Sequence, residues 1–329
     1  MAYTDSEDLN YIGTLFETAA RETPFLNSLG GALSPDGTLN LNRVRTVSSF
    51  EFDCAVPYDS GAGTQPAITE AASVTGVTAN TITRGQDNNT CQIFQRKAEV
   101  SYKKLSTTGT ISTGLLGGGN IDGVTPGLNF NMSGNSVMDE LNFQVGVNMK
   151  GMASDINYSF LRGTYQAAAS ALTAAKTRGI ITAVTTNAVA AGGANLSTTH
   201  VNAVIKLMVD SGAPRRNVVA IANSYQCQQL GSLYEHVPMD RNVGGSAITR
   251  IMTPFCTFDI LYDPSMPTDT ILFAEYSVIK ITICPVLGQL IIIELKPTDG
   301  ASVAKQMYLQ AGIDYGPEEY HGKITGLAV

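Results

Sequence analysis

The sequence is poor in charged residues. Asp, Glu, Lys and Arg make up only 15% of the chain, whereas soluble domains typically carry about a quarter. Gly, Ser, Thr and Asn stand at many positions where Lys or Glu would ordinarily face water, although hydrophobic residues still make up 43% of the chain. Such a composition is typical of a subunit whose faces are covered by other subunits. A secreted monomer with an uncharged polar coat is the alternative.

An excess of basic residues is also missing. The formal net charge is −7 and the isoelectric point is near 5.0. A protein that binds nucleic acid by neutralising its phosphates needs a basic surface, so the composition disfavours that class of protein. The charge balance does not exclude a protein that encloses nucleic acid without binding it.

The cysteines lack the pattern of a disulfide scaffold, since they are odd in number and show no CxxC spacing. They are Cys54, Cys91, Cys227, Cys256 and Cys284. We therefore expect reduced thiols and a cytoplasmic product. The N-terminus lacks the basic and apolar run of a signal peptide. The most apolar window, Val278 to Leu295, is interrupted by Lys280 and Glu294, which is typical of strands rather than of a membrane span.

Motifs for catalysis and for metal or cofactor binding are absent from the sequence. We find no Walker A, GxSxG, HExxH or EF-hand pattern. The three histidines, His200, His236 and His321, have no neighbours at metal-ligand spacing. Cys227 and His236 could in principle act as nucleophile and base, but Cys227 has no basic neighbours to activate it. We predict no enzyme, and no catalytic, cofactor or metal site.

The first third of the chain predicts an arm followed by a long β-ribbon. A short helix, Glu17 to Arg21, is expected to stop before Pro24, because a residue that precedes proline disfavours helical angles. Alternating apolar and polar residues over 44–54 and 91–105 predict two strands. Few large apolar residues lie between them, so we expect an antiparallel ribbon with a mobile tip that extends into the surroundings. A hairpin folded back on its own domain is the alternative.

One long amphipathic helix is predicted from Val137 to Leu161. It follows a glycine-rich connector, 109–135, which lacks the GK[ST] ending of a phosphate-binding loop, and Ser136 suits its N-cap. Apolar residues at spacings of three and four form one stripe. The core-facing residues of this stripe are Leu141, Val145, Met149, Met152, Ile156 and Phe160. The opposite side carries Asn142, Lys150, Ser154, Asp155 and Asn157.

The remaining chain alternates helices with strands. A helix capped by Thr198 or Thr199 and ended at Gly212 precedes a buried strand, 217–222, and Asn223 then caps another helix. Further strands are predicted at 258–262, 270–273, 279–283 and 290–295. Segments 303–309 and 323–327 close the chain as two strands or as a strand and a short helix. Together these elements predict an α+β fold.

Aromatic and charged side chains of the arm and the ribbon are candidates for contacts between subunits. Cations at 96–97 and 103–104 can meet acidic residues of a neighbouring copy and so fix register and orientation. A solvated strand edge is the alternative explanation for these cations. The candidate contact residues are Phe16, Phe25, Glu51, Asp53, Tyr58, Phe94, Arg96, Lys97, Lys103 and Lys104.

Several segments follow one another in a recognisable order. They read ETPFLNSLG, NNTCQIFQRKAEVSYKKL, MDELNFQVGVNMKGMASDINYSFLRGTYQ, THVNAVIKLMVDSGAPRRNVVAIANS and FDILYDPSMPTDTILFAEYSVIKI. In this order they resemble the major capsid proteins of tailed bacteriophages. The resemblance implies five parts: an N-terminal arm (1–43), an extended loop (44–105), a peripheral domain with connector and spine helix (106–168), an axial domain (169–285), and a return to the peripheral domain (286–329).

The resemblance also implies a structural function. Copies would form the hexamers and pentamers of an icosahedral virion shell that encloses double-stranded DNA, assembled in the bacterial cytoplasm without a membrane, with portal, scaffold or decoration proteins as further partners. Some relatives join subunits through a lysine of the extended loop; residues 46–95 contain no lysine, so we expect non-covalent contacts. The connector is longer than the family pattern. An encapsulin-like cargo compartment, a tail protein and an α/β enzyme are the alternatives.

Overall fold

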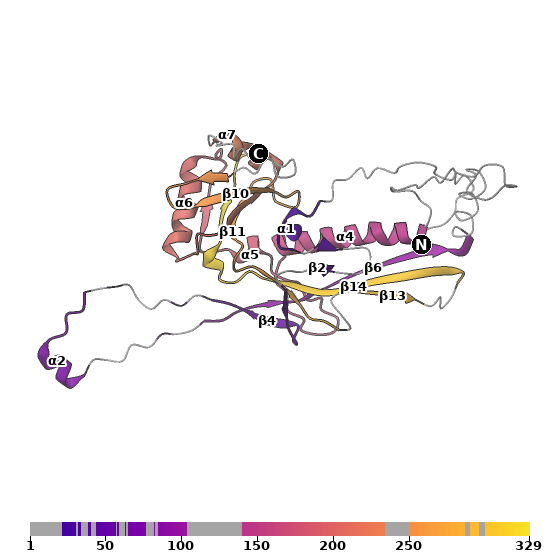
Figure 1. The fold of residues 1–329 in the computed structure, drawn as a ribbon, viewed down its shortest axis with the longest axis horizontal. Coiled ribbons are helices and arrows are strands. Elements are labelled where there is room, and N and C mark those ends of the chain that lie inside the picture. Colours follow the sequence, from indigo (N-terminus) through magenta and orange to yellow (C-terminus); the bar gives the residue numbers. More distant parts are fainter. Residues whose placement is uncertain are drawn as a thin grey trace, which may run out of the picture.

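The computed structural model describes residues 22–30, 32–33, 39–40, 44–56, 58, 63, 65–76, 82, 85–103, 140–233, 250–286, 290–295 and 300–329. Two β-sheets and one long helix make up the body of the described chain, and a long projection leaves this body (Figure 1).

A five-stranded sheet is built around strand β14 (Ser302–Asp314). Strand β6 (Gln92–Ser101) pairs antiparallel with β14 along one edge. Along the other edge β14 pairs antiparallel first with β13 (Leu290–Leu295) and then with β12 (Lys280–Ile283). Strand β3 (Val44–Thr46) completes the sheet parallel to β12. The sheet therefore joins segments that lie far apart in the sequence.

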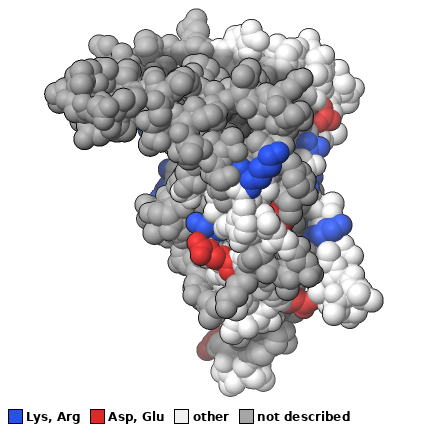
Figure 2. Space-filling model, turned by 90° about the vertical axis from the view of Figure 1, so that its right-hand side faces the viewer, with Lys and Arg blue, Asp and Glu red and all other residues white. Residues whose placement is uncertain are grey.

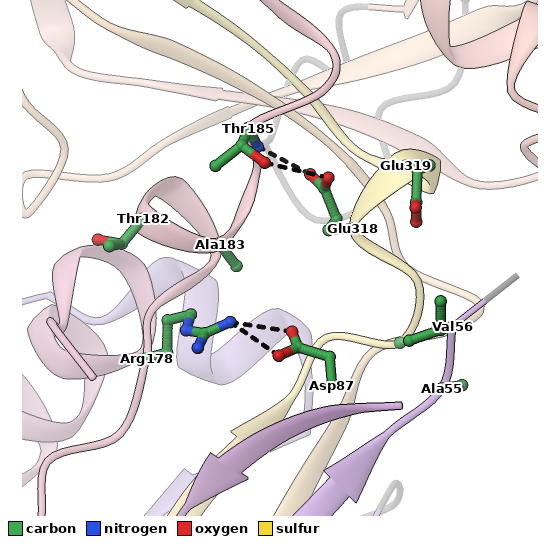
Figure 3. Close-up of a pocket in the computed structure, with 10 residues that line it drawn as sticks. Ala55, Val56, Asp87, Arg178, Thr182, Ala183, Thr185, Glu318 and Glu319 are labelled. Atoms are coloured by element: carbon green, nitrogen blue, oxygen red, sulfur yellow. Dashed lines mark hydrogen bonds and ion pairs between the residues drawn. The ribbon is translucent and has the colours of Figure 1, made fainter. Parts of the chain in front are cut away.

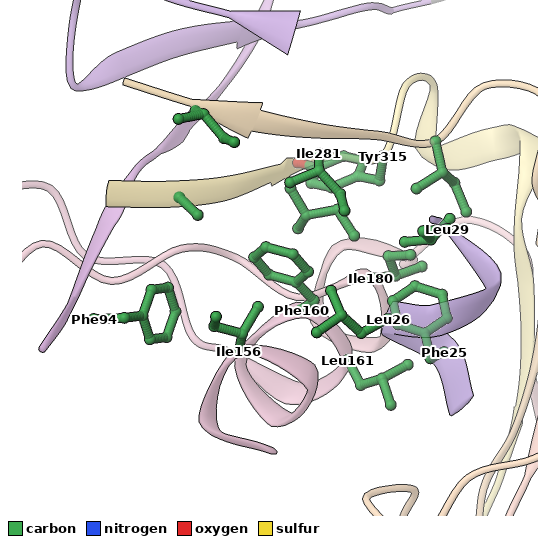
Figure 4. Packing of buried hydrophobic residues seen from close by; sticks show 14 of the residues in the cluster. Phe25, Leu26, Leu29, Phe94, Ile156, Phe160, Leu161, Ile180, Ile281 and Tyr315 are labelled. Atoms are coloured by element: carbon green, nitrogen blue, oxygen red, sulfur yellow. The ribbon is translucent and has the colours of Figure 1, made fainter. Parts of the chain in front are cut away.

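Helix α4 (Glu140–Arg162) lies along one face of this sheet (Figure 1). The predicted stripe faces the sheet: Val145, Met149, Met152, Ile156 and Phe160 are buried, and Leu141 is half-buried. Figure 4 shows that Ile156 and Phe160 point from the helix toward residues of the sheet and of the first helix. Burying one such side chain stabilises the fold by about 1.5–3 kcal/mol. The predicted N-terminus of the helix lies outside the described residues.

A six-stranded sheet forms the second body. In spatial order its strands are β7 (Ala188–Ala190), β15 (Gly322–Thr325), β11 (Ile271–Glu275), β8 (Val218–Ala222), β10 (Thr257–Tyr262) and β9 (Arg250–Met252). Strand β8 runs parallel to β10 and antiparallel to β11. Every residue of β8 and β11 is buried, as expected of apolar strands at the centre of a sheet.

Two helices accompany the six-stranded sheet. Helix α6 (Thr198–Asp210) buries four apolar residues on one side, and its N-cap is Ser197 rather than the predicted Thr198 or Thr199. Helix α7 (Ser224–Leu233) has the predicted cap, since the Gln226 N–H donates a 2.9 Å hydrogen bond to Oδ1 of Asn223. A short helix, α5 (Ile180–Ala183), and a single turn, η1 (Glu318–Tyr320), link the two bodies.

The projection leaves the body at strands β4 (Glu51–Cys54) and β5 (Asp87–Thr90), which pair antiparallel. Helix α2 (Glu70–Thr75) lies far from both sheets (Figure 1), and none of its residues is buried. The predicted ribbon is wrong in its pairing, because β3 joins β12 and β6 joins β14. Period-2 alternation tells which face of a strand is buried, but it does not identify the partner strand.

The described part of the arm begins with helix α1 (Pro24–Ser28), followed by the paired strands β1 (Ala32–Leu33) and β2 (Leu39–Asn40). Pro24 was expected to follow the end of a helix, whereas it starts one. Proline suits the first helical position, because its φ is fixed near the helical value and its missing N–H is not needed there. The predicted helix Glu17 to Arg21 lies outside the described residues.

The two sheets do not follow the predicted domain boundary at residue 285. Strand β12, predicted in the axial domain, pairs within the five-stranded sheet. Strand β15, predicted in the return to the peripheral domain, pairs with β7 and β11 in the six-stranded sheet. The chain therefore crosses between the two bodies after Glu275 and again after Asp314, because long-range strand pairing decides domain membership.

Candidate assembly interface

The projection exposes apolar side chains at its tip. Ile68 is 57% exposed and Val74 is 84% exposed, and Tyr58, on the way to the tip, is 69% exposed. Helix α2 is short but well formed, because the Thr69 side chain accepts a hydrogen bond from the Ala72 N–H at its N-terminus. The rest of the chain therefore leaves these apolar side chains uncovered.

Arg45 and Asp314 hold strand β4 at the root of the projection. The Arg45 guanidinium lies 2.9 Å from Oδ1 of Asp53 and 3.0 Å from Oδ2 of Asp314. It also donates a hydrogen bond of 2.6 Å to the Asp53 carbonyl oxygen. Hydrogen bonds from the Asp53 backbone and from Arg45 hold the pKa of the Asp53 carboxyl below its usual value. The β4 strand is thereby tied to the end of β14.

A second cluster holds strand β5. Arg178 Nη1 lies 2.9 Å from Oδ2 of Asp87, and the Tyr315 hydroxyl donates to the same oxygen at 2.6 Å. Burial raises the pKa of Tyr315, so the phenol stays protonated and remains a donor. Arg178 also lies over the ring of Tyr165, 5.0 Å from its centroid. We name the residues Asp87, Arg178 and Tyr315 the root cluster.

Buried Asn89 fixes the backbone next to the root cluster. Its side-chain amide donates to the Ile313 carbonyl at 2.8 Å, and its Oδ1 accepts from the Arg178 N–H at 2.8 Å and the Thr90 N–H at 2.9 Å. One side chain thus joins β5, β14 and the segment before α5. Such a fully used amide is costly to replace, because each lost bond leaves a buried polar group unpaired.

A cavity of about 370 Å³ lies beside the root cluster. Figure 3 shows Ala55 and Val56 from one side of the projection, Asp87 from the other, and Thr185, Glu318 and Glu319 across from them. The Glu318 carboxylate is engaged, since it accepts hydrogen bonds from the backbone N–H and hydroxyl groups of Thr185 and Thr186. Within the described residues no cluster of three or more His, Cys, Asp or Glu could hold a metal ion.

The anchor of helix α1 was not predicted. The backbone N–H of Phe25 donates a hydrogen bond of 3.0 Å to Oδ2 of Asp263. The backbone N–H of Leu26 donates one of 3.0 Å to Oδ1 of Asn157. Asn157 also donates to both carboxylate oxygens of Asp263 at 3.0 Å. Both side chains are completely buried. The placement of Asn157 on the polar side of the long helix is therefore wrong, since its amide is needed to satisfy the buried carboxylate and the N-terminus of α1.

The structure corrects two candidate contact residues. Phe25 is 0% exposed and meets Tyr276 edge-on at 6.1 Å, and Phe94 is 5% exposed beneath α4. Both side chains are therefore used within the subunit's own core rather than between subunits. The sequence does not show whether an aromatic residue in a polar segment packs into its own subunit or against a neighbouring one.

The charged candidates mostly have partners inside the chain. Asp53 pairs with Arg45, as described above. Arg96 pairs with Asp155 of α4 at 2.6 Å, and Lys97 pairs with Glu99 at 2.9 Å. Glu51, Tyr58 and Lys103 are exposed. Phe16 and Lys104 lie outside the described residues.

Figure 2 shows that the described part of this face carries a few basic and a few acidic side chains among uncharged ones, and that a basic and an acidic side chain lie side by side on it. None of the five cysteines is in a disulfide, and burial raises the pKa of Cys54 and of Cys91 to about 12, so these thiols stay protonated. No helix among the described residues is long and apolar enough to span a membrane.

Comparison with known proteins identifies this architecture. A family model described as SU10 major capsid protein matches residues 2–328. No curated protein matches the chain in sequence. The chain resembles the solved capsid of cyanophage A-1(L) with a TM-score of 0.61 and 12% identity, over 98% of each chain.

Two further solved structures share the fold. The capsid of the native GTA particle has a TM-score of 0.55 and 14% identity over 100% of this chain and 96% of the other, and the holo-SrpI encapsulin complex of Synechococcus elongatus PCC 7942 has a TM-score of 0.56 and 9% identity over 100% and 97%. At such identities these likenesses show the fold alone, and they confirm the predicted α+β capsid fold. Since the family match spans almost the whole sequence, the chain belongs to the SU10 major capsid protein family and is a major capsid subunit of an icosahedral virion shell.

Proposed function

We propose that the projection makes the principal contacts between copies, and that these copies form the hexamers and pentamers of the shell. The observation that carries this proposal is the exposed helix α2 at the end of a projection whose root is fixed by two sets of ion pairs. A projection that buries none of its own tip gains stability only when another molecule covers it. Glu51 and Tyr58 remain the proposed contact residues nearer the root.

We assign the predicted parts of the capsid subunit to the two sheets. The five-stranded sheet with α4 corresponds to the peripheral domain, and the six-stranded sheet with α6 and α7 corresponds to the axial domain at the centre of a capsomer. Residues 55–86 correspond to the extended loop, and the first residues up to 43 to the arm. Strand pairing supports these assignments. Relative to the boundaries predicted from sequence, β12 and β15 are exchanged, and the extended loop, predicted as 44–105, loses β3 and β6 to the five-stranded sheet.

The proposed content of the shell is double-stranded DNA, held without sequence-specific binding. The net charge of −7 supports enclosure rather than phosphate binding. Reduced cysteines support assembly in the cytoplasm of a bacterial host. We further propose that the chain has no catalytic activity, and that portal, scaffold or decoration proteins act as partners.

Electron microscopy of the purified chain tests the assembly proposal. Closed shells or ring-shaped capsomers are expected, whereas tubes would support a tail protein and a lasting monomer would contradict self-assembly. Nuclease-protected DNA in particles from infected cells supports a virion shell, and protein cargo without DNA supports a compartment.

Denaturing gels of the same particles test the prediction of non-covalent contacts. The absence of lysine from residues 46–95 predicts a single band at the mass of one chain, 34.8 kDa. A ladder of covalent oligomers would contradict this prediction.

A further inference from the structure

A second ordered excursion leaves the body between α4 and α5. Its residues 164–178 start after Gly163 and return at Gly179, where the two backbones touch: the Gly179 N–H donates a hydrogen bond of 2.9 Å to the Gly163 carbonyl oxygen. A Cβ on Gly179 would lie 2.6 Å from the Gly163 nitrogen, so only glycine fits this crossing. Compact surface loops with such closed ends are frequently functional.

The neck of this loop is held by further bonds. Gln166 and Lys176 exchange two backbone hydrogen bonds, 3.1 and 2.9 Å long. Thr177 is buried, and its backbone N–H donates to Oε1 of Gln92 at 3.3 Å. The next residue, Arg178, belongs to the root cluster and pairs there with Asp87. The loop is therefore fixed to the same part of the body that orients the projection.

The tip of the loop is apolar and uncharged. Residues 167–175 read AAASALTAA. A turn closes the tip, with the Thr173 N–H donating to the Ser170 carbonyl at 3.0 Å and the two hydroxyls 3.1 Å apart. The turn holds Leu172 outward at 98% exposure, more than any other large apolar side chain in the described part of the chain. We name residues 167–175 the alanine loop.

We propose that the alanine loop is a contact surface between copies of this chain, and that Leu172 inserts into an apolar site of a second copy. This inference rests on the proposed self-assembly and adds a contact distinct from the projection. A charged partner is disfavoured, since residues 167–175 offer no cation to a phosphate and no charge to a polar protein surface. In a ring of identical subunits, a protruding group on one surface of each subunit binds a site on a different surface of the next subunit.

The exposure of Leu172 allows a direct test by substitution. Because the side chain touches almost nothing within its own subunit, Leu172→Ser should leave the urea unfolding midpoint of the unassembled subunit unchanged. We expect the concentration at which half of the chains are assembled, measured by sedimentation, to rise about tenfold. Leu172→Met should restore it to near the wild-type value, since Met offers similar apolar volume.

Two control variants separate this contact from general effects. Ala171→Ser adds a hydroxyl to the adjacent exposed position and should assemble as the wild type does. Met252→Ser removes an apolar side chain that is 75% exposed on the six-stranded sheet, and it reports the effect of losing any exposed apolar group. A rise specific to Leu172→Ser supports the proposal.

The outcomes distinguish this inference from the proposed function. If the wild-type chain assembles and Leu172→Ser assembles at the same concentration, the contact is overturned and self-assembly stands. The contact is likewise overturned if Leu172→Ser forms normal shells but loses an accessory protein. If the wild-type chain never assembles, both proposals are overturned.

Discussion

The Tyr315 hydroxyl donates a hydrogen bond of 2.6 Å to Oδ2 of Asp87, and so ties the end of strand β14 to the return strand of the projection. The preceding residue, Asp314, binds Arg45, which in turn holds Asp53 on the outgoing side. Two consecutive residues therefore hold both strands of the projection. The direction in which the projection leaves the body depends on this pair.

Tyr315→Phe removes the hydroxyl and leaves the buried ring in place. Asp87 keeps Arg178, so we expect a loss of about 1–2 kcal/mol in the free energy of unfolding. Hydrogen exchange should increase in residues 87–90 and remain unchanged in β8. Tyr320→Phe is the matched control, since its hydroxyl bonds no described residue. Equal effects of the two variants would contradict a specific role for the Tyr315 hydroxyl.

Asn157→Ala should destabilise the subunit by about 2–4 kcal/mol. The change leaves the Asp263 carboxylate short of a donor and the Leu26 N–H without an acceptor, and both groups are buried. Because these bonds hold α1, limited proteolysis should cut residues 22–30 faster. Exposed Asn195→Ala should change stability by less than about 0.5 kcal/mol. Undiminished protection of α1 in the Asn157 variant would show that other contacts anchor this helix.

Stability should fall as the pH falls from about 6.5 to about 4 because of His321. The ring is fully buried, and burial lowers its pKa from 6.5 to about 4. Its Nδ1 accepts from the Glu275 N–H, and its Nε2 is 2.6 Å from the Tyr315 carbonyl oxygen, so the neutral ring is the one that fits. The unfolded chain binds the proton more readily in this window, which favours unfolding.

The contribution of the neutral His321 ring to the free energy of unfolding is fully present above pH 6.5. Roughly 3 kcal/mol of this free energy is lost by pH 4. Urea unfolding at pH 7 and pH 4.5 measures it. His321→Gln has no titrating ring, so its stability should depend less on pH over this range than that of the wild type. Parallel pH profiles for the two chains would show that groups other than His321 govern the acid response.

Gly163→Ala should cost about 2–3 kcal/mol, because the new methyl group would meet the carbonyl oxygens of Ser159 and Thr177 at the neck of the alanine loop. Gly146, within helix α4, provides the matched control. A Cβ there meets nothing within 4 Å, and alanine is favoured in a helix, so Gly146→Ala should stabilise by up to about 1 kcal/mol. Thermal unfolding compares the two, and destabilisation by both would contradict the close backbone crossing.

Local patterns in the sequence predicted those elements whose stability is itself local. The spacing of apolar residues predicted the buried stripe of α4 and the bounds of β13. The residue type at the start of α7 predicted the cap at Asn223. The pairing of β6 with β14 could not be predicted, since the partners lie some 200 positions apart and alternation is the same for any partner. Asn157 was misplaced for the same reason: the groups that require it inside, Asp263 and the Leu26 N–H, lie far away in the sequence.

The candidate interface was predicted in outline and wrongly in detail. The shortage of large apolar residues between the two predicted strands indicated a projection, and the structure has one. Phe25 and Phe94 looked like contact residues because aromatic side chains in polar segments need a surface, but their own core supplies it. Leu172 was overlooked within an alanine-rich passage, whose lack of a period gives no sign of exposure.

Strand β5 runs into β6 after a single residue, Cys91, and β6 is paired with β14 along its whole ten-residue length. A force that pulls the tip of the projection outward is therefore transmitted along the axis of β6. A pull in that direction strains all the hydrogen bonds between β6 and β14 at the same time, instead of breaking them one after another from an end. Strands β6 and β14 therefore resist a pull on the tip over the whole length of their pairing.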